Sequence, residues 1–264
     1  MKPLYKWPGG KAREIEIIEK NLPKNFERYI EPFFGGGALF FYLENNSNVI
    51  NELNKEVCNF LELIKQGMAK EIYDKLVNIS NDEKTYYTIR AWEPKTTLDK
   101  AIRFYYLRKT CFRGLSRYNS SGVFNVPYGN YKTYVLDELL EKKYNELLKN
   151  TVIMNEDFNE VFNHYDDEND FCFLDPPYHN TFSNYTSDGF NDDKHIKLAE
   201  RFKKTKMKCL MIIGKTDLIE ELYQGYITEE YAKKYSITRS TKQEKNSGIK
   251  RVVKGSIHLI VKNY

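Results

Sequence analysis

The chain has 264 residues, of which 41% are hydrophobic and 15% aromatic, enough for a large buried core and unlike a disordered chain. Its 41 Lys and Arg residues and 37 Asp and Glu residues give a net charge of +4, which excludes few classes of protein. No apolar run approaches the roughly 20 residues of a membrane-spanning helix, and no signal-peptide pattern follows Met1.

Cysteine and histidine usage indicates the compartment. The four cysteines are isolated in the sequence, and the four histidines have no metal-ligand spacing, so we expect neither disulfides nor a metal site. These features predict a reduced, cytoplasmic protein.

The 21 Tyr and 16 Phe residues are interleaved with Lys and Arg. This texture is compatible with nucleic-acid binding, in which rings stack on bases, and equally with a Lys-rich solvated surface.

Six segments have the apolar, β-branched character of strands: 28–34, 48–51, 151–154, 171–174, 209–213 and 256–261. Helical periods lie between several of them. Three sets of residues are each expected to share one helix face: Ile15, Ile18 and Leu22; Val57, Leu61 and Ile64; Leu136, Leu140 and Leu147. Strands that alternate with helices predict an α/β fold with a mostly parallel sheet. The stretch from about 55 to about 148 has almost no strand signal and is predicted to be a helical insertion, and the basic stretch 242–254 an exposed loop.

A glycine-rich turn, Gly35 to Gly37, follows the first predicted strand and precedes a helix. Glycines here let the backbone turn sharply and approach a ligand closely. The next strand ends at Glu52, and an acid about 20 residues after such a turn commonly binds the two hydroxyls of a ribose. The turn alone could be structural, but with the acid it favours a cofactor that contains a nucleoside.

The tetrapeptide Asp175-Pro176-Pro177-Tyr178 directly follows the predicted strand 171–174. Ligands of open α/β sheets bind at the carboxyl ends of strands, where this motif is expected to lie. A carboxylate and a fixed proline carbonyl could accept both hydrogens of an exocyclic amine, which would direct its lone pair at an electrophile. The Tyr178 ring could stack on the base. A rigid Pro-Pro turn is the simpler alternative.

Two further segments contain candidate binding residues. Near the start, Lys6-Trp7-Pro8-Gly9-Gly10-Lys11 precedes a helix, where backbone N–H groups and a lysine favour a carboxylate or phosphate. A capped terminal turn is the alternative. The segment 112–129 has turn residues at Ser120–Gly122 between Arg, Tyr, Asn and Phe, which predicts a projecting hairpin. Arg and Asn side chains can read guanine and adenine, whereas a surface hairpin could merely face water.

In this order, the four motifs resemble those of the Dam-type DNA adenine-N6 methyltransferases, which use S-adenosylmethionine. The matching patterns are Trp7-x-Gly9-Gly10-Lys11, Phe33-x-Gly35-x-Gly37, Arg117-Tyr118-Asn119…Gly122…Phe124-Asn125-Val126-Pro127-Tyr128-Gly129 and Asp175-Pro176-Pro177-Tyr178. The resemblance covers essentially the whole chain. It implies a Rossmann-like methyltransferase sheet with helices on both faces, formed by residues 1–54 and 149–264. Residues 55–148 are then an inserted, mostly helical target-recognition domain with a β-hairpin.

The resemblance also implies roles for individual residues. Those expected to hold S-adenosylmethionine are Trp7, Lys11, Phe33, Gly35, Gly37, Glu52, Asp157 and Asp175. The catalytic residues that hold the target adenine are expected to be Asp175, Pro176 and Tyr178. Those expected at the DNA are Lys6, Phe112, Arg113, Leu115, Arg117, Asn119, Asn125 and Pro127. No metal is implied. The chain departs from the family at Phe112-Arg113, where Tyr-Asn is frequent, and at Gly214-Lys215, which replaces a Ser-Asn pair.

The sequence thus predicts an enzyme that flips an adenine out of double-stranded DNA and methylates its N6, at GATC or a related short site. Alternatives are the same fold acting on RNA adenine or cytosine N4, an inactive methyltransferase-fold DNA-binding module, and a nicotinamide dehydrogenase that shares the glycine-rich unit. We expect a monomeric bacterial or phage-encoded protein that associates with the nucleoid and not with a membrane. A separately encoded restriction endonuclease is a candidate partner.

Overall fold

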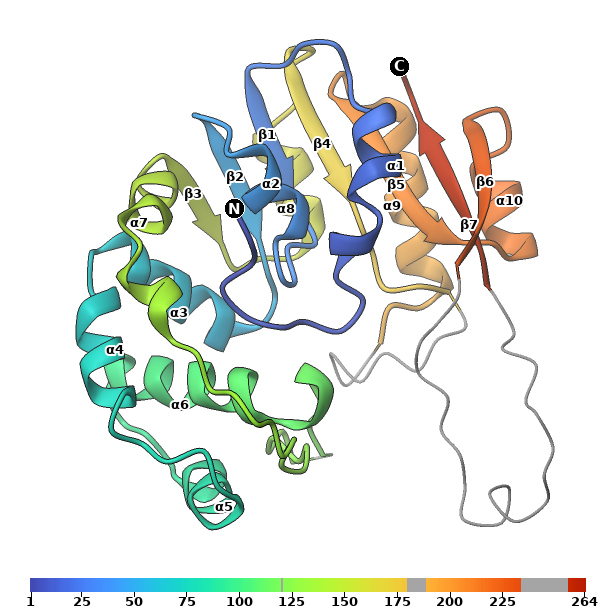
Figure 1. The fold of residues 1–264 in the computed structure, drawn as a ribbon. Coiled ribbons are helices and arrows are strands. Elements are labelled where there is room, and N and C mark those ends of the chain that lie inside the picture. Colours follow the sequence, from blue (N-terminus) through green and yellow to red (C-terminus); the bar gives the residue numbers. More distant parts are fainter. Residues whose placement is uncertain (120, 180–188, 234–255) are drawn as a thin grey trace, which may run out of the picture.

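The computed structural model describes residues 1–119, 121–179, 189–233 and 256–264. Within these residues the strands form one sheet in the order β3-β2-β1-β4-β5-β7-β6 (Figure 1). Their bounds are β1 Arg28–Glu31, β2 Asn48–Asn51, β3 Thr151–Met154, β4 Asp170–Leu174, β5 Lys208–Gly214, β6 Ile227–Lys233 and β7 Ser256–Lys262. Strands β1 to β5 are parallel, and β7 runs antiparallel to both β5 and β6. The mostly parallel sheet predicted from the sequence is confirmed.

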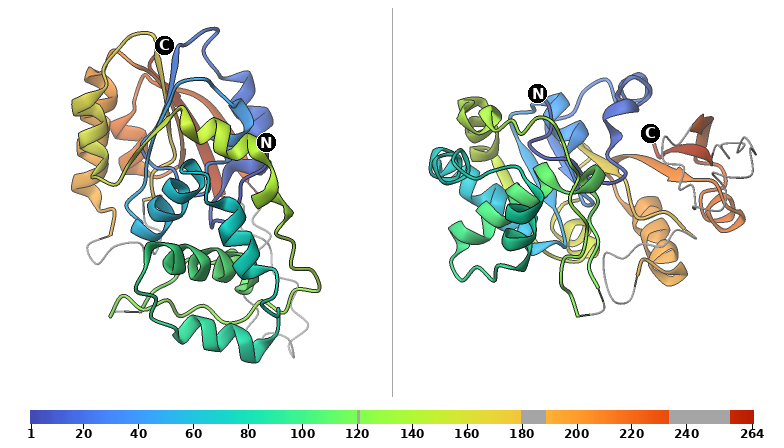
Figure 2. Two further views of the ribbon diagram at one scale, coloured as in Figure 1. Left: turned by 90° about the vertical axis from the view of Figure 1, so that its left-hand side faces the viewer. Right: turned by 60° about the horizontal axis from the view of Figure 1, so that its bottom comes forward.

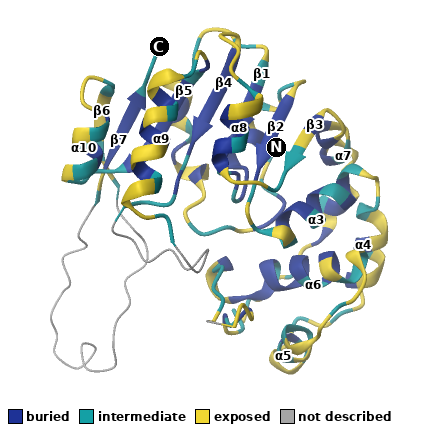
Figure 3. Ribbon diagram, turned by 180° about the vertical axis from the view of Figure 1, so that it is seen from behind, coloured by how far each residue is buried: buried dark blue, intermediate teal, exposed yellow. Residues whose placement is uncertain are grey.

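Helices cover both faces of the sheet: one face is seen in Figure 1 and the other in Figure 3, where the dark blue colour shows that most strand residues between them are buried. Their bounds are α1 Ile15–Lys20, α2 Ala38–Leu43, α3 Lys55–Lys65, α4 Ala69–Leu76, α5 Glu83–Ala91, α6 Thr97–Thr110, α7 Lys142–Lys149, α8 Phe158–His164, α9 Asp192–Lys204 and α10 Asp217–Leu222. Short 3-10 helices span Lys11–Arg13, Phe112–Gly114 and Asp137–Leu140. None of the helices in the described ranges is long and apolar enough to cross a membrane.

The central strand β4 explains why the core has two halves. Successive side chains of a strand point to opposite faces of the sheet. Phe171 and Phe173 accordingly pack in the cluster with α2, α3 and α6, whereas Cys172 and Leu174 pack in the cluster with α8, α9 and α10. All five residues of β4 are buried, as expected for a strand covered on both faces.

Helices α4, α5 and α6 lie beyond the ends of β2 and β3, on the side toward which the parallel strands run (Figures 1 and 2). Helix α3 joins them to the sheet, since it packs on β3, α6 and α7. This arrangement puts the region from 55 onward next to the carboxyl edge of the sheet. Loops that follow β1, β2 and β4 therefore face it.

Two details differ from the sequence-based prediction, and part of the prediction falls on residues that the structure does not describe. Strand β6 was not predicted, because its sequence, Ile-Thr-Glu-Glu-Tyr-Ala-Lys, is polar and it lies at the sheet edge. The expectation that Leu136, Leu140 and Leu147 share one helix face was wrong. A 3-10 helix ends before Glu141, α7 begins after it, and Leu140 is 46% exposed. Ser120 and the predicted loop 242–254 lie outside the described residues.

Candidate functional site

A cavity of about 360 Å³ opens at the carboxyl edge of the sheet. It is lined by the segment that precedes α1, by the segments that follow β1, β2, β3 and β4, and by residues such as Tyr118 and Lys233, so parts of the chain that are distant in sequence meet there. Among the lining residues are Trp7, Gly9, Lys11, Glu31, Phe33, Gly35, Gly37, Glu52, Tyr118, Asp157, Phe158, Asp175, Pro176, Tyr178 and Lys233. The structure thus brings together every predicted cofactor and catalytic residue.

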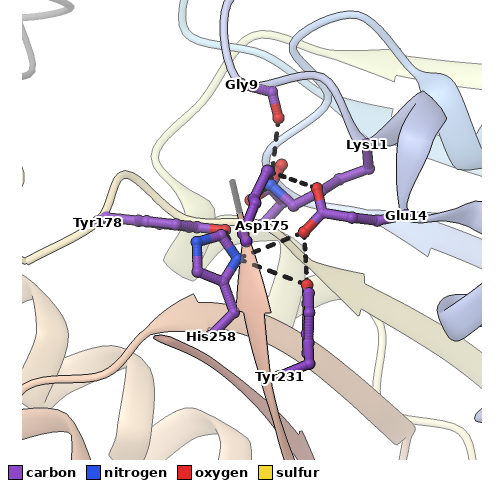
Figure 4. A network of polar contacts seen from close by, with 8 residues as sticks. Gly9, Lys11, Glu14, Asp175, Tyr178, Tyr231 and His258 are labelled. Atoms are coloured by element: carbon purple, nitrogen blue, oxygen red, sulfur yellow. Dashed lines mark hydrogen bonds and ion pairs between the residues drawn. The ribbon is translucent and has the colours of Figure 1, made fainter. Parts of the chain in front are cut away.

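Asp175 follows β4 and reaches the N-terminal segment across the cavity (Figure 4). Lys11 Nζ donates to Asp175 Oδ1 at 2.5 Å and to the carbonyl oxygen of Gly9 at 3.2 Å. Lys11 itself is buried. Burial raises the pKa of Asp175, and the ammonium of Lys11 acts in the opposite direction. The ion pair therefore offsets part of the cost of holding a carboxylate away from water.

The glycine-rich turn is locked against the N-terminal segment. Gly35 and Gly37 have positive φ angles of 52° and 63°, which favour glycine. A Cβ at Gly35 would lie 2.8 Å from Cδ1 of Trp7, and one at Gly37 would lie 2.3 Å from Cζ of Phe34. Side chains at these positions would therefore collide with the rings of Trp7 and Phe34. With glycine at both positions, only backbone atoms of Gly35 and Gly37 line the cavity.

Glu52 is fixed by backbone amides at the end of β2. Its Oε2 accepts from the amide of Gly35 at 2.8 Å, and its Oε1 from the amide of Asn54 at 2.9 Å. Burial raises the pKa of Glu52, while these backbone bonds act to lower it. Glu31, a buried acid that the sequence analysis did not select, lies nearby and accepts from the hydroxyl of Tyr29 at 2.8 Å. Burial holds the pKa of Glu31 well above its usual range.

Asp157 and Phe33 also line the cavity. Asp157 is the N-cap of α8, and its Oδ1 accepts from the amide of Asn159 at 3.0 Å. Phe33 packs against Phe158, with ring centroids 5.4 Å apart, and against Phe190, with centroids 5.6 Å apart. The cavity lining thus includes both a carboxylate, which can accept from the edge of a purine, and aromatic rings, which can pack on its face.

The segment 111–129 forms two isolated antiparallel bridges, Cys111 with Tyr128 and Tyr118 with Phe124, and its described residues form no extended strands. Arg117 Nε donates to Asn125 Oδ1 at 2.7 Å, and its Nη2 donates to the Asn125 carbonyl at 3.0 Å. Two predicted DNA-contacting side chains are thus bound to each other.

The remaining predicted DNA residues lie in or near the same segment and make separate contacts. Asn119 Oδ1 accepts from two amides of its own turn, and the Pro127 carbonyl accepts from the amide of Phe112 at 2.9 Å. The Leu115 carbonyl accepts from Arg108. Lys6 Nζ lies 4.0 Å from the ring centroid of Tyr131.

Arg113 has a left-handed backbone, with φ 55°, and its guanidinium lies 5.2 Å from the ring centroid of Phe112. Phe112 is 41% exposed. A non-glycine residue in this conformation costs on the order of 1 kcal/mol, which tertiary contacts must offset. Tyr131 supplies one such contact, since its hydroxyl accepts from the Arg113 amide at 2.7 Å.

Sequence reasoning missed a polar network beside Asp175 (Figure 4). Glu14, Tyr231, Lys233 and His258 come from the start of α1 and from β6 and β7. No motif identifies them in the sequence. Glu14 lies three residues after Lys11, so helical spacing could have placed it near Lys11, but the partners on β6 and β7 depend on tertiary contacts. No group of His, Cys, Asp and Glu residues in the described ranges could hold a metal ion.

Comparison with known proteins identifies the family. A family model described as D12 class N6 adenine-specific DNA methyltransferase matches residues 7–238, and the chain belongs to this family. The chain is 44% identical to the Type II methyltransferase M.CviBI of Paramecium bursaria Chlorella virus, over the full length of both. It is 32% identical to the Type II methyltransferase M.MjaIII of Methanocaldococcus jannaschii, over all of this chain and 99% of that protein.

A more distant relative carries a different name. The DNA adenine methylase of Haemophilus influenzae is 29% identical, over 94% of this chain and 91% of that protein. The family and these relatives confirm the resemblance and the class of enzyme predicted from the sequence. The sheet and its flanking helices agree with the Rossmann-like methyltransferase fold.

Proposed function

We propose that this chain transfers a methyl group from S-adenosylmethionine to N6 of an adenine flipped out of duplex DNA, at GATC or a related short site. One observation carries the proposal. A single cavity is lined by both the Asp175–Tyr178 motif and the Gly35–Gly37 turn with Glu52. Residues suited to hold an exocyclic amine therefore face the same space as residues suited to hold a nucleoside.

The cavity has the donor and acceptor set that S-adenosylmethionine needs. Neither Gly35 nor Gly37 can be replaced by a larger residue, because a Cβ would collide with Trp7 or with Phe34. With no side chains at these positions, the backbone of the turn can approach a ligand closely. Glu52 would bind the ribose hydroxyls, and Asp157 with Phe33 would bind the adenine ring. Trp7 and Lys11 would hold the methionine end. When bound, the cofactor supplies a methyl group on a positively charged sulfur.

The target amine would meet two acceptors. Among the described residues, Lys11 is the hydrogen-bond partner of Asp175, through Oδ1, which leaves Oδ2 for an amine hydrogen. The carbonyl of Pro176 would take the second hydrogen. With both hydrogens held, the nitrogen lone pair would be available to form the N–C bond as the S–C bond of the cofactor breaks, and one amine proton would leave through its acceptor. Proximity and orientation would supply the acceleration. Tyr178 would stack on the flipped base and offset part of the few kcal/mol that flipping costs.

Residues 55–148 would form the target-recognition domain and residues 1–54 and 149–264 the catalytic domain. Arg117, Asn119 and Asn125 would read base edges, and Pro127 would contact a thymine methyl group. Lys6 and Arg113 would contact bases of the recognition site. Phe112 and Leu115 would fill the space beside the flipped adenine. Helices α4–α6 lie on the cavity side of the sheet, which supports this division (Figure 1).

The test is transfer of labelled methyl groups to genomic DNA that lacks adenine methylation and, in a parallel reaction, to RNA, followed by mapping of the methylated bases. The proposal predicts label on N6 of adenine in one short motif. Label on RNA or on cytosine N4 would reassign the substrate. Binding of DNA without any transfer would identify an inactive binding module.

We further propose that the protein is a cytoplasmic monomer. Two relatives are named Type II methyltransferases, which supports a role beside a separately encoded restriction endonuclease. Protection of host DNA at the mapped motif against a nuclease that cuts that motif would test this role. Cleavage of DNA from cells that express the chain would contradict it.

A further inference from the structure

The ring of Tyr178 is held by residues outside its own motif (Figure 4). On one side lies Gly214, where a Cβ would be 3.1 Å from Cδ2 of the ring. The imidazole of His258 meets the ring edge to face, with centroids 5.0 Å apart and planes at 78°. Lys11 Nζ lies 5.1 Å from the ring centroid. The tyrosine is therefore fixed by β5, β7 and the N-terminal segment.

His258 is the polar member of this set. It lies on β7 opposite Gly214 of β5 and Tyr231 of β6, and it is fully buried. Its Nδ1 is 3.3 Å from Oη of Tyr178, 3.3 Å from Oε1 of Glu14 and 3.4 Å from Oη of Tyr231. One ring nitrogen thus faces the hydroxyl of the motif tyrosine, a second tyrosine hydroxyl and a carboxylate.

Glu14 is a buried carboxylate with several donors. The hydroxyl of Tyr231 donates to Oε1, and Lys233 Nζ donates to Oε2, each at 2.5 Å. Burial alone would raise the pKa of Glu14, but the contacts with His258, Lys11, Lys233 and Tyr231 outweigh it and lower the pKa to about 2. Glu14 is therefore charged at neutral pH.

A charged carboxylate beside a histidine nitrogen keeps the proton on that nitrogen. With its proton on Nδ1, His258 presents an N–H group to Glu14 Oε1, Tyr178 Oη and Tyr231 Oη, at 3.3, 3.3 and 3.4 Å. The oxygen of Tyr178 is then an acceptor, and displacement of the side chain would break this contact. Rotation of the ring about its own axis leaves the oxygen in place and is opposed instead by the edge-to-face packing of the imidazole. The arrangement parallels the way second partners orient histidines at other functional sites.

We propose that Glu14 and His258 are positioning residues for Tyr178, with Glu14 fixing the proton of His258 and His258 fixing the ring on which the flipped adenine stacks. This inference rests on the proposed function of the site. A purely structural role, in which the network only joins β6 and β7 to α1, is the competing explanation. The two differ in what they predict for the bound base.

The experiment uses the full chain and its mapped DNA site. His258→Leu removes the N–H group and fills the buried space with an apolar side chain. His258→Asn retains an N–H donor near the position of Nδ1. We expect His258→Leu to lower kcat about 10-fold, because small misplacements of a reacting group are costly, with an unchanged Kd for S-adenosylmethionine. His258→Asn should restore most of the rate.

A spectroscopic readout separates positioning from stability. The target adenine is replaced by 2-aminopurine, whose emission is quenched by stacking and rises when the base is unstacked. In the complex with His258→Leu, the flipped base should be brighter than in the wild-type complex, because the ring no longer holds it. His258→Asn should return the emission toward the wild-type value.

His195→Leu is the matched control, since His195 is also fully buried and neither of its ring nitrogens has a hydrogen-bond partner in the described ranges. It should leave kcat within about two-fold, the scatter expected of a side chain that makes no polar contact. Glu14→Gln supplies a second route if His258→Leu does not fold. It should lower kcat, and combining it with His258→Leu should add little, because both act through one contact.

The outcomes are distinguishable. A wild-type chain that transfers no methyl group to nucleic acid overturns the proposed function and this inference with it. A wild-type chain that is active, with His258→Leu and Glu14→Gln as fast as His195→Leu, overturns the positioning role alone. So does a slow His258→Leu variant that His258→Asn does not rescue and whose 2-aminopurine emission matches the wild-type complex.

Discussion

Asp175 enters the cavity already paired with Lys11, and this pairing determines what the carboxyl group can do. A carboxyl group that took up a proton on burial would be a donor as well as an acceptor. Next to the ammonium, the group is stabilised as a carboxylate, which only accepts hydrogen bonds. An acceptor is what an amine with two N–H bonds requires.

Removal of this carboxylate should therefore stop the reaction without detaching DNA. For Asp175→Ala we expect kcat to fall at least about 100-fold, the typical cost of losing a charged group that acts on the reacting atoms. DNA affinity should remain within about three-fold, because the predicted groove contacts lie on the segment 111–129. Single-turnover methyl transfer and fluorescence anisotropy measure the two quantities.

Asp74→Ala is the control for loss of one acidic side chain, since Asp74 forms an exposed pair with Lys70 on α4. It should behave as the wild-type chain in both measurements. If Asp175→Ala also matched the wild-type rate, the carboxylate would have no part in the transfer.

His195 predicts an acid-dependent loss of stability. Burial, assisted by His179 and opposed by Asp192, lowers the pKa of His195 to about 4. The unfolded chain has a histidine pKa near 6.5, so between about pH 6.5 and 4 it binds a proton that the folded chain does not. Stability from this residue is therefore complete above about pH 6.5 and falls as the pH is lowered toward 4.

The variant His195→Leu removes this titration. Between pH 7 and pH 4 the wild-type chain should lose on the order of 2 kcal/mol more unfolding free energy than the variant. Urea unfolding at several pH values gives both curves, and their difference cancels the other titrating groups. A difference that does not change with pH would show that His195 takes up a proton in the fold as readily as in the unfolded chain.

At the scale of elements, the segment 111–129 holds its polar side chains in place before DNA is present. Arg117 is bound through two nitrogens to Asn125, and Asn119 closes the turn between them. A guanidinium group that is held in one direction, like that of Arg117, suits bidentate contact with guanine. The order of this segment comes from its own hydrogen bonds and not from extended strands.

Arg117→Ala should weaken discrimination between sites more than binding itself. We expect about 1–3 kcal/mol less preference for the mapped site over a site with one altered base pair. Competition binding with the two duplexes measures the preference. Lys203→Ala, which removes an exposed positive charge from the last turn of α9, next to the amino end of β5, should leave the preference unchanged. Equal effects of the two variants would remove Arg117 from base recognition.

The elements also show how far sequence alone leads. Six of the strands, all except β6, and the Asp175 and Gly35 turns were predictable, because buried strands are continuous apolar runs and their ends have distinctive turn residues. Strand β6 was not, since two glutamates interrupt it. The same strand contributes Tyr231 and Lys233 to the site. The Glu14–His258 contact depends on how β7 is inserted between β5 and β6, which single-sequence periodicity does not encode.

On the scale of the whole molecule, one hydrophobic core joins the two regions that sequence analysis divided. Tyr5 of the N-terminal segment contacts Phe60 of α3 and Phe104 of α6, with ring centroids 5.9 and 5.3 Å apart. Phe60 and Phe104 are themselves 5.5 Å apart. Both belong to the cluster that also packs on β4 through Phe171.

Such continuity predicts one cooperative unfolding transition. Calorimetry should give a single peak. Phe104→Ala should move this whole peak to lower temperature and reduce the free energy of unfolding by about 3–5 kcal/mol, as expected for a buried aromatic residue. An exposed substitution on the same region, Trp92→Phe, should leave the transition in place. Two separate peaks would mean that residues 55–148 unfold independently of the sheet.

The contact between Trp7 and the glycine-rich turn gives the protein an optical property of its own. The chain has two tryptophans: Trp7 lines the cavity, and Trp92 ends α5 and is 38% exposed. In a Trp92→Phe protein all indole emission originates at the cavity wall. A ligand that settles on Gly35 changes the surroundings of that one fluorophore, so occupancy can be followed in real time with no label and no DNA.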